Sequence, residues 1–290
     1  MSASAARGRV EQLGAHLTGG PLLKGEVAII TGAGRGIGKT TALTFAAHGA
    51  SIVVFDIDAS VADGVVGEIR ANGGSAEAFA GRDITSAEVP DELVAFAISK
   101  YGKINHIING AGFTIQAPLK DLSDSAWESV MAVHSTAPFR LTRAALPHML
   151  DKKYAGENRS ITNISSMAGI QGLAYGANYS AGKAALIGLT KSSARELGRY
   201  GIRVNAVAYG FVQTRLIGDS DKDGETHKLP DGSVIPVGVP TERAFAKALL
   251  HGNVLKRPGT TQEAAGPLLF LASPLASYIT GQILQISGDI

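Results

Sequence analysis

Short apolar runs alternate along the chain with longer segments in which apolar positions recur at helical spacing. The runs predict strands near residues 26–31, 51–55, 75–80, 104–109, 159–165, 201–207 and 282–286, with helices between them. Such alternation is typical of a parallel sheet covered by helices on both faces. The pattern therefore predicts an α/β fold, namely a three-layer doubly wound Rossmann fold with a seven-stranded parallel sheet. The runs 104–108 and 202–207 are less apolar than buried strands usually are.

The same alternation of strand and helix patterns continues over residues 24–290, which we expect to form a single domain. Residues 1–23 lack the continuous apolar core of a secretory signal, so we expect a flexible N-terminal arm there. The uncharged stretch 264–286 is long enough to suggest a membrane span, but prolines, a glycine and glutamines interrupt it. We therefore expect a helix, a turn and a strand, with Thr260 and Glu263 forming a capping box at the start of that helix.

A glycine-rich turn follows the first predicted strand. Gly32, Gly36 and Gly38 stand between that strand and a helical pattern, in the spacing Gly-x3-Gly-x-Gly. A dinucleotide pyrophosphate must approach the backbone at a helix N-terminus, where free N–H groups attract anions and side chains would obstruct. The turn thus predicts a dinucleotide site, although a glycine-rich strand-to-helix connection can also be only a tight turn.

A tyrosine, a lysine and a serine form the second chemical signal. Tyr179 and Lys183 are four residues apart, which on a helix places them one turn apart on the same face. A phenol with a pKa of about 10 needs a nearby cation to act as an acid or base at neutral pH. Ser166, at the end of a predicted strand, can donate a hydrogen bond to the same substrate oxygen. Taken alone, a tyrosine and a lysine at this spacing usually lie on the exposed face of a helix without a catalytic role. The serine and the glycine turn favour a catalytic role for them here.

The overall composition limits the classes of partner. The chain of 290 residues has 27 basic and 25 acidic residues, a formal net charge of +2, and the basic residues are scattered. This distribution favours neither nucleic acid nor an anionic membrane surface as a partner. The chain has no cysteine, which excludes disulfides and thiolate metal sites. A reducing compartment is compatible with this, and we expect a cytoplasmic protein without a metal.

With these motifs in order, the chain resembles the short-chain dehydrogenases/reductases in their compact single-domain form. The 3-oxoacyl-carrier-protein reductases and related alcohol dehydrogenases are among the most similar in pattern. The resemblance covers roughly residues 24–290 and rests on five ordered motifs: Thr31-Gly-x3-Gly-Ile-Gly38, Asp83-Ile-Thr85, Asn109-Gly-Ala-Gly112, Ser166 with Tyr179-x3-Lys183, and Arg203-Val-Asn-Ala-Val207 followed by Gly210 and Thr214.

The resemblance implies a role for each matched residue. Tyr179 would pass a proton to or from the substrate oxygen, Ser166 would orient that oxygen, and Lys183 would bind the ribose hydroxyls and lower the tyrosine pKa. It also implies a homotetramer with the helices 124–150 and 177–199 and the last strand at its interfaces. The cofactor contacts that it implies are Gly32, Arg35, Gly36, Ile37, Gly38, Asp56, Asp83, Ile84, Asn109, Gly112, Tyr179, Lys183, Val212 and Thr214.

The choice of cofactor depends on Asp56, which lies 24 residues after Gly32 and follows the second predicted strand. A carboxylate at this spacing meets the adenosine ribose diol and repels a 2′-phosphate. Arg35 in the glycine turn is an argument for NADP, since many NADP-using members of the family carry a basic residue there. We expect NAD, with NADP less favoured; the alternative for Asp56 is a solvated turn acid beside Asp58.

Three positions depart from the pattern of the family. His134 occupies the place of an asparagine that is the family's fourth catalytic residue and holds a water beside the lysine. His134 can offer its backbone carbonyl, join the proton relay through its ring, or be a packed helix residue. Gly110 replaces the second asparagine of Asn-Asn-Ala-Gly. Tyr209 replaces the proline before Gly210 and is a second, weaker candidate for contacting substrate.

The segment 215–255 follows Thr214 and is longer than a simple loop, so we expect it to be the substrate lid. Asp231-Gly232 within it predicts a small hairpin. Residues 219–224 copy half of a calcium-binding loop, but Pro230 stands where the bidentate glutamate would be, so we expect no calcium site.

The combined signals predict an oxidoreductase that interconverts a secondary alcohol and a ketone on a small-molecule substrate by hydride transfer with NAD(H). One alternative is an NADPH-dependent ketone or 3-oxoacyl reductase. Another is a dinucleotide-binding redox sensor that has lost catalysis, which the substitutions at His134 and Tyr209 keep open. The identity of the substrate is not encoded in these motifs.

Overall fold

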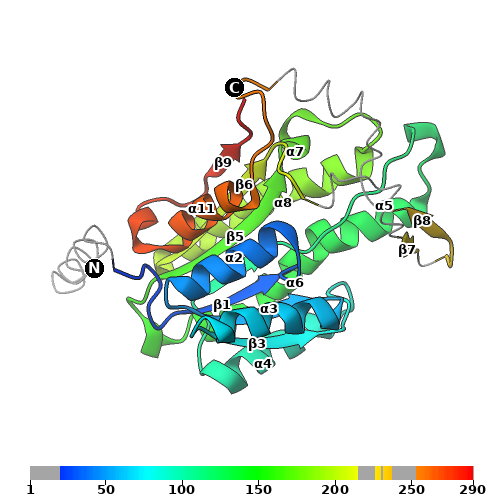
Figure 1. Cartoon of the computed structure of the whole chain (residues 1–290). Coiled ribbons are helices and arrows are strands. Elements are labelled where there is room, and N and C mark those ends of the chain that lie inside the picture. Colours follow the sequence, from blue (N-terminus) through cyan, green and yellow to red (C-terminus); the bar gives the residue numbers. More distant parts are fainter. Residues whose placement is uncertain (1–19, 215–225, 230, 237–252, 290) are drawn as a thin grey trace.

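The computed structural model describes residues 20–214, 226–229, 231–236 and 253–289. Its centre is a seven-stranded parallel sheet in the order β3-β2-β1-β4-β5-β6-β9 (Figure 1). The strands are β1 (Val27–Thr31), β2 (Ser51–Asp56), β3 (Ser75–Ala80), β4 (His106–Asn109), β5 (Arg159–Ser166), β6 (Ile202–Tyr209) and β9 (Ile283–Ile286). The predicted doubly wound α/β fold and its seven strands are therefore confirmed.

Helices connect the strands as the alternating pattern predicted. The α-helices are α2 (Gly36–Ala47), α3 (Ala59–Ala71), α4 (Val89–Tyr101), α5 (Asp124–Met131), α6 (Ala137–Met149), α7 (Ala168–Gln171), α8 (Ala177–Leu197) and α11 (Thr261–Ala272). Short 3-10 turns are η1 (Leu119–Asp121), η3 (Lys152–Tyr154), η4 (Gly198–Tyr200) and η6 (Pro274–Ala276). The long helix expected over 124–150 contains a π-helical turn, η2 (Ala132–Thr136), between α5 and α6.

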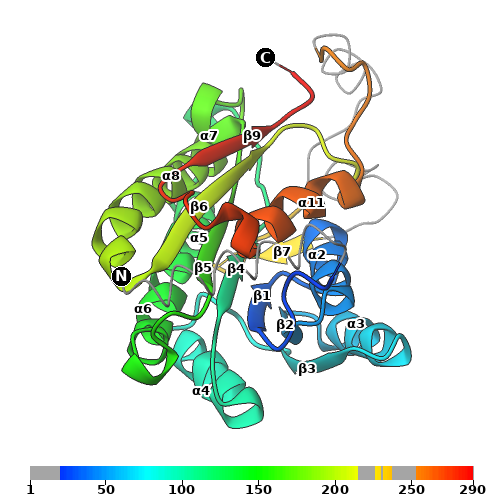
Figure 2. The same cartoon turned by 90° about the vertical axis from the view of Figure 1, so that its left-hand side faces the viewer.

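Two apolar cores lie on the two faces of the sheet. Figure 2 shows α2, α3 and α11 on one face and α4, α6 and α8 on the other. Phe45 of α2 and Leu268 of α11 belong to one core, while Leu93 of α4 and Leu141 of α6 belong to the other; all four are fully buried. Because the central strands are covered on both faces, their residues are buried without alternation, as in the fully buried β1.

The polar residues of the central strands have buried partners. The His106 ring of β4 lies 2.5 Å from the Glu26 carboxylate through Nε2 and 2.8 Å from the Ser160 hydroxyl through Nδ1. Arg203 of β6 donates to the backbone carbonyls of Leu271 and Ala272, at the end of α11. These contacts satisfy buried polar groups that would otherwise destabilise the sheet. They explain why strands 104–108 and 202–207 tolerate their polar residues.

Two local predictions from the sequence are confirmed. The Thr260 side chain accepts from the Glu263 N–H, and the Glu263 carboxylate accepts from the Thr260 N–H, so α11 begins with a capping box. The antiparallel hairpin β7 (Thr226–Lys228) and β8 (Val234–Pro236) surrounds the Asp231-Gly232 turn. The rest of the predicted lid, at 215–225, 230 and 237–252, lies outside the described residues, as does the half-motif for calcium at 219–224.

Two leucines within the predicted arm contact the core of the domain. Leu23 is fully buried and its N–H donates to the His48 carbonyl at the end of α2. Leu22 is partly buried and packs against the same core, and the boundary at residue 24 stays a prediction. The remainder of the predicted arm, residues 1–19, lies outside the described residues.

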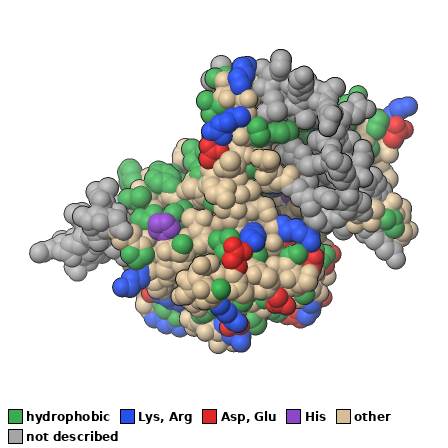
Figure 3. Space-filling model, in the orientation of Figure 1, with side chains coloured by type: hydrophobic (Ala, Val, Ile, Leu, Met, Phe, Trp, Pro, Cys, Tyr) green, Lys and Arg blue, Asp and Glu red, His purple; other side chains and the backbone are tan. Residues whose placement is uncertain are grey.

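The described surface carries charges of both signs. On the face shown in Figure 3, basic and acidic side chains are interspersed among the coloured residues. Arg35 pairs with Asp58, Lys39 with Glu68 and Arg82 with Glu92 at 2.7–2.9 Å. Among the described residues, no helix has the length and apolar character needed to cross a bilayer.

Candidate active site

A cavity of about 890 Å³ opens at the carboxyl ends of the sheet strands. Strands β2 and β3 lie on one side of β1 and β4 lies on the other side, and the cavity is located where the strand order reverses. The connections that follow β1 and β4 diverge at this switch point, and ligands of such sheets bind there. Predicted site residues that line the cavity are Gly32, Arg35, Gly36, Ile37, Gly38, Asp56, Asp83, Ile84, Gly112, His134, Ser166, Tyr179, Lys183, Val212 and Thr214.

The glycine turn at the start of α2 leaves no room for side chains. A Cβ on Gly32 would lie 2.9 Å from the Ala111 backbone, and one on Gly38 would lie 2.0 Å from the Gly32 carbonyl oxygen. Gly32 and Gly36 also have positive φ angles of 69° and 53°. Arg35 provides no side-chain cap for the first N–H groups of α2. These features fit an anionic group approaching the N-terminus of a helix.

Two carboxylates shape the other side of this turn. The Asp56 carboxylate accepts from the Gly34 N–H at 2.9 Å and from the Asp58 N–H at 3.1 Å. The Arg35 guanidinium is 2.9 Å from the Asp58 carboxylate. The Asp56 carboxylate therefore forms part of the cavity wall, and the Arg35 guanidinium is already paired with Asp58.

The loop after β4 is held against the glycine turn. The Thr31 hydroxyl accepts from the Gly110 and Ala111 N–H groups at 3.0 and 3.1 Å. Asn109 itself does not line the cavity; its amide donates to Asn163 at 2.8 Å in the buried layer beneath. Of the predicted cofactor contacts, Asn109 thus lies behind the wall, because its side chain joins two neighbouring strands.

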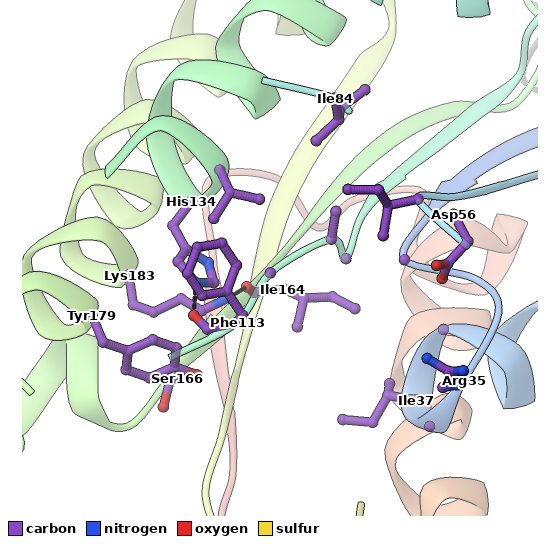
Figure 4. Close-up of a pocket in the computed structure, with 18 of the residues that line it drawn as sticks. Arg35, Ile37, Asp56, Ile84, Phe113, His134, Ile164, Ser166, Tyr179 and Lys183 are labelled. Atoms are coloured by element: carbon purple, nitrogen blue, oxygen red, sulfur yellow. Dashed lines mark hydrogen bonds between the residues drawn. The ribbon is translucent and has the colours of Figure 1, made fainter. Parts of the chain in front are cut away.

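Ser166, Tyr179 and Lys183 meet at the opposite end of the cavity (Figure 4). Ser166 ends β5, while the other two lie on α8, as the spacing predicted. The Lys183 Nζ is 5.5 Å from the centroid of the Tyr179 ring and donates to the Ile164 carbonyl at 2.7 Å. The Ser166 hydroxyl accepts from the Ala168 N–H at 3.1 Å, which fixes its position after the strand.

Burial controls the proton affinities of this group. Burial lowers the pKa of Lys183 to about 7. Burial also raises the pKa of Tyr179, and the hydrogen bond from the Ser166 hydroxyl opposes that rise. In the protein without cofactor the pKa of Tyr179 is therefore raised rather than lowered, with burial as the largest cause.

His134 sits in the π-helical turn with its ring packed against the tyrosine. The two ring centroids are 5.1 Å apart and the planes make an angle of 88°. The imidazole occupies the space above Gly112, where a Cβ would lie 2.1 Å from Cε1, and beside Gly182, where a Cβ would lie 2.9 Å from the His134 Cβ. Gly112 therefore leaves the space that the His134 ring occupies, while Gly182 leaves space for its Cβ.

The hydrogen bonds of His134 decide its tautomer. Nε2 is 2.7 Å from the Phe113 carbonyl oxygen, which can only accept, so Nε2 carries the proton. Nδ1 is buried and has no hydrogen-bond partner among the described residues. Burial and the adjacent Lys183 charge hold the pKa of His134 well below its usual value. The ring is thus a neutral donor to Phe113 with an acceptor nitrogen.

The comparisons with known proteins agree with this geometry. The family model described as short chain dehydrogenase matches residues 26–225. This chain belongs to the short-chain dehydrogenase/reductase family. The resemblance inferred from its motifs is confirmed, and the chain is an oxidoreductase of that family.

The relatives of this short-chain dehydrogenase include proteins with different substrates. It is 36% identical over 268 residues to the 3-oxoacyl-[acyl-carrier-protein] reductase FabG of Thermotoga maritima, covering 92% of this chain and 98% of that protein. It is 39% identical over 267 residues to the 7alpha-hydroxysteroid dehydrogenase of Escherichia coli K12, covering 92% and 94%. A crystal structure of a dehydrogenase/reductase from Sinorhizobium meliloti 1021 superposes with a TM-score of 0.78 at 32% identity, covering 92% and 95%.

Some cavity residues of this dehydrogenase escaped the sequence analysis: Phe113, Ser129, Thr226 and Leu229. Phe113 directly follows the Asn109–Gly112 motif, and this position could have indicated that it lines the cavity. Nothing in the local sequence pattern distinguishes Ser129. Tyr209 lines the cavity, but its hydroxyl donates to the Ala264 carbonyl of α11 and burial raises its pKa. Its phenol is therefore engaged in a structural bond, which weakens its candidacy for substrate contact.

No cluster of three potential metal ligands occurs in the part of the chain that the structure describes. The charged side chains that line the cavity include Lys183 and the exposed Glu128.

Proposed function

We propose that this short-chain dehydrogenase interconverts a secondary alcohol and a ketone, with Tyr179 as the acid or base. The observation that supports it most is that Tyr179, Ser166 and Lys183 line the same cavity as the glycine turn at the start of α2. A nicotinamide cofactor bound there would supply or take up the hydride. The chain then needs only to bind the substrate oxygen and move one proton.

In the direction of reduction, the Tyr179 hydroxyl donates its proton to the carbonyl oxygen as hydride reaches the carbon. The Ser166 hydroxyl donates a hydrogen bond to the same oxygen and orients it. An anionic cofactor close to Lys183 favours the ammonium form, and the ammonium then stabilises the tyrosinate that remains. In oxidation, the tyrosinate accepts the proton of the alcohol.

The variant Tyr179→Phe tests the role of the phenol. We expect turnover to fall by about 10²- to 10⁴-fold, the usual contribution of general acid–base catalysis. NADH binding, measured by fluorescence titration, should change by less than about twofold because the phenyl ring preserves packing against His134. The control is Tyr278→Phe, at a fully exposed tyrosine. Substantial turnover by a folded Tyr179→Phe protein would remove the phenol from its role.

We propose NAD(H) as the preferred cofactor because of Asp56. Its carboxylate is held in the cavity wall by the Gly34 N–H and would repel a 2′-phosphate, while Arg35 is engaged with Asp58. Replacing the carboxylate by Asp56→Asn should lower the ratio of kcat/KM for NADH to that for NADPH by at least about tenfold, equal to about 1.4 kcal/mol. An unchanged ratio would count against the carboxylate as the selecting group.

We propose that His134 positions Tyr179 rather than relaying protons. A ring whose Nε2–H is bound by a carbonyl has nowhere to pass that proton, and burial disfavours imidazolium. In His134→Asn the pH dependence of kcat should therefore keep the wild-type inflections while kcat falls, since the edge-to-face contact is lost. Loss or displacement of an inflection in the variant would instead indicate that the ring titrates during turnover.

A 3-oxoacyl reductase is the second candidate, favoured by relatives of that name at 36% and 38% identity. A spectrophotometric screen of NADH and NADPH oxidation should therefore include a 3-oxoacyl thioester, a 7-oxosteroid and simple ketones. Cofactor binding without turnover of any compound would favour the redox-sensor alternative. We also propose a homotetramer in the cytoplasm; light scattering of the purified protein tests the number of subunits.

A further inference from the structure

The leucine that directly follows strand β7 is buried although it stands next to a hairpin turn. Leu229 is 3% exposed and lines the active-site cavity. Its N–H donates to the Ser233 carbonyl at 2.8 Å, and its carbonyl accepts from the Gly232 N–H at 2.9 Å. Asp231 tightens the same turn by accepting from the N–H and hydroxyl of Ser233. The turn therefore holds the leucine in a defined position.

The neighbours of Leu229 are apolar. It forms a buried cluster with Ile115, which follows β4, and with Ala126 and Val130 of α5. The rings of Phe113 and Tyr179 pack against this cluster and also line the cavity. Phe113 lies beside His134 and Tyr179 at the reacting end of the site (Figure 4). A continuous apolar surface thus extends from the catalytic phenol to the hairpin.

We propose, resting on the proposed function, that Leu229 and Phe113 form the wall against which one substituent of the reacting carbon binds. The substrate oxygen must approach the Tyr179 hydroxyl, so a group attached to the same carbon reaches the surface formed by these side chains. The substrate class is accordingly a ketone or secondary alcohol that carries an alkyl chain or apolar ring. Leu229 is the specificity-determining residue of this wall, because it comes from the hairpin rather than from the sheet and its helices.

The strength of the effect follows from apolar burial. Each methylene that moves from water onto such a surface contributes about 0.8 kcal/mol, which corresponds to about a fourfold gain in kcat/KM. Incomplete contact reduces this gain, so we expect octan-2-one to exceed butan-2-one by at least about tenfold in the wild-type protein.

The test uses Leu229→Asn, which keeps a similar length but makes the wall polar. We expect the ratio of kcat/KM for octan-2-one to that for butan-2-one to fall at least about fivefold, because the longer chain places more methylenes on the wall, while the affinity for NADH changes by less than about twofold. The matched control is Val234→Ala on β8, at a side chain that is 60% exposed; its ratio should equal that of the wild type. A leucine that only anchors the hairpin would change both ketones alike.

A binding measurement separates failure of this inference from failure of the proposed function. Calorimetry of octanamide and butanamide binding to the protein–NADH complex measures how much the wall contributes to affinity, and the amides are not reduced. Tighter binding of octanamide that is lost in Leu229→Asn supports the wall, even if neither ketone is turned over, in which case the proposed reaction fails. An unchanged ketone ratio in Leu229→Asn, or equal affinity of the two amides for the wild-type protein, overturns the inference.

Discussion

The buried ammonium of Lys183 should make the cofactor-free protein less stable than its Met variant at low pH. Burial lowers the lysine pKa from 10.5 to about 7. The unfolded chain therefore binds more protons than the folded chain between these values, and stability rises with pH across that window. Below the folded pKa the full cost applies; above 10.5 it vanishes.

The magnitude follows from the shift. A difference of about 3.5 pKa units at 1.36 kcal/mol each gives a cost of about 5 kcal/mol below pH 7. Lys183→Met removes this cost but leaves the Ile164 carbonyl without its 2.7 Å donor, a loss of about 1–3 kcal/mol. The variant should therefore be more stable by about 2–4 kcal/mol at pH 6, and the advantage should reverse to a loss of about 1 kcal/mol near pH 10.

Urea unfolding of the cofactor-free protein at equal protein concentrations, from pH 6 to pH 10, measures this difference. The control is Lys191→Met, at an exposed lysine on the same helix, which should show no such pH dependence. A stability difference between Lys183→Met and wild type that stays constant over this range would refute the reasoning, because the buried charge would then not be its cause.

Three further perturbations probe other contacts by urea unfolding. Gly112→Ala places a Cβ 2.1 Å from His134 Cε1 and should lower the free energy of unfolding by about 1–3 kcal/mol. In a His134→Ala background the same substitution should lower it by less than about 0.5 kcal/mol. Equal losses in the two backgrounds would contradict the packing argument. Thr260→Ala removes the capping box and should lower the free energy of unfolding by about 0.5–2 kcal/mol. An unchanged free energy of unfolding would show that the cap does not stabilise α11. His106→Leu leaves the Glu26 carboxylate buried beside an apolar group and should cost about 3–5 kcal/mol; His106→Leu combined with Glu26→Leu should recover most of it, and no recovery would argue against charge burial as the cause.

The proposed role of Lys183 and the stability of the fold place opposite demands on the same side chain. Burial brings the pKa of Lys183 close to neutral pH, and burial of the ammonium also destabilises the folded chain. Burial also raises the pKa of Tyr179. A bound anion would offset the cost, so cofactor binding should stabilise this region more than its contacts alone suggest.

The histidine in the π-helical turn depends on residues that are far apart in the sequence. Gly112 follows β4 and leaves space for the imidazole, while Gly182 lies on α8 and leaves space for the Cβ of the same residue. An asparagine at this position would fill that space less completely. The departure from the family pattern at His134 is thus accompanied by a close fit to its surroundings.

The amino-acid sequence by itself determined the order of strands and helices, the glycine turn, the capping box at Thr260 and the face shared by Tyr179 and Lys183. All of these depend on residues close together in the chain, whose periodicity and turn chemistry act locally. The meeting of the motifs at one edge also followed, because parallel strands place their carboxyl ends together.

Only the tertiary structure decided which groups neighbour one another across the sequence. It pairs His106 with Glu26, places Asn109 behind the cavity wall and brings Leu229 into the apolar cluster against which Tyr179 packs. It also decides that Lys183 is buried deeply enough to lose much of its proton affinity. Burial, desolvation and packing arise from atoms contributed by distant segments, and no local pattern of residues carries that information.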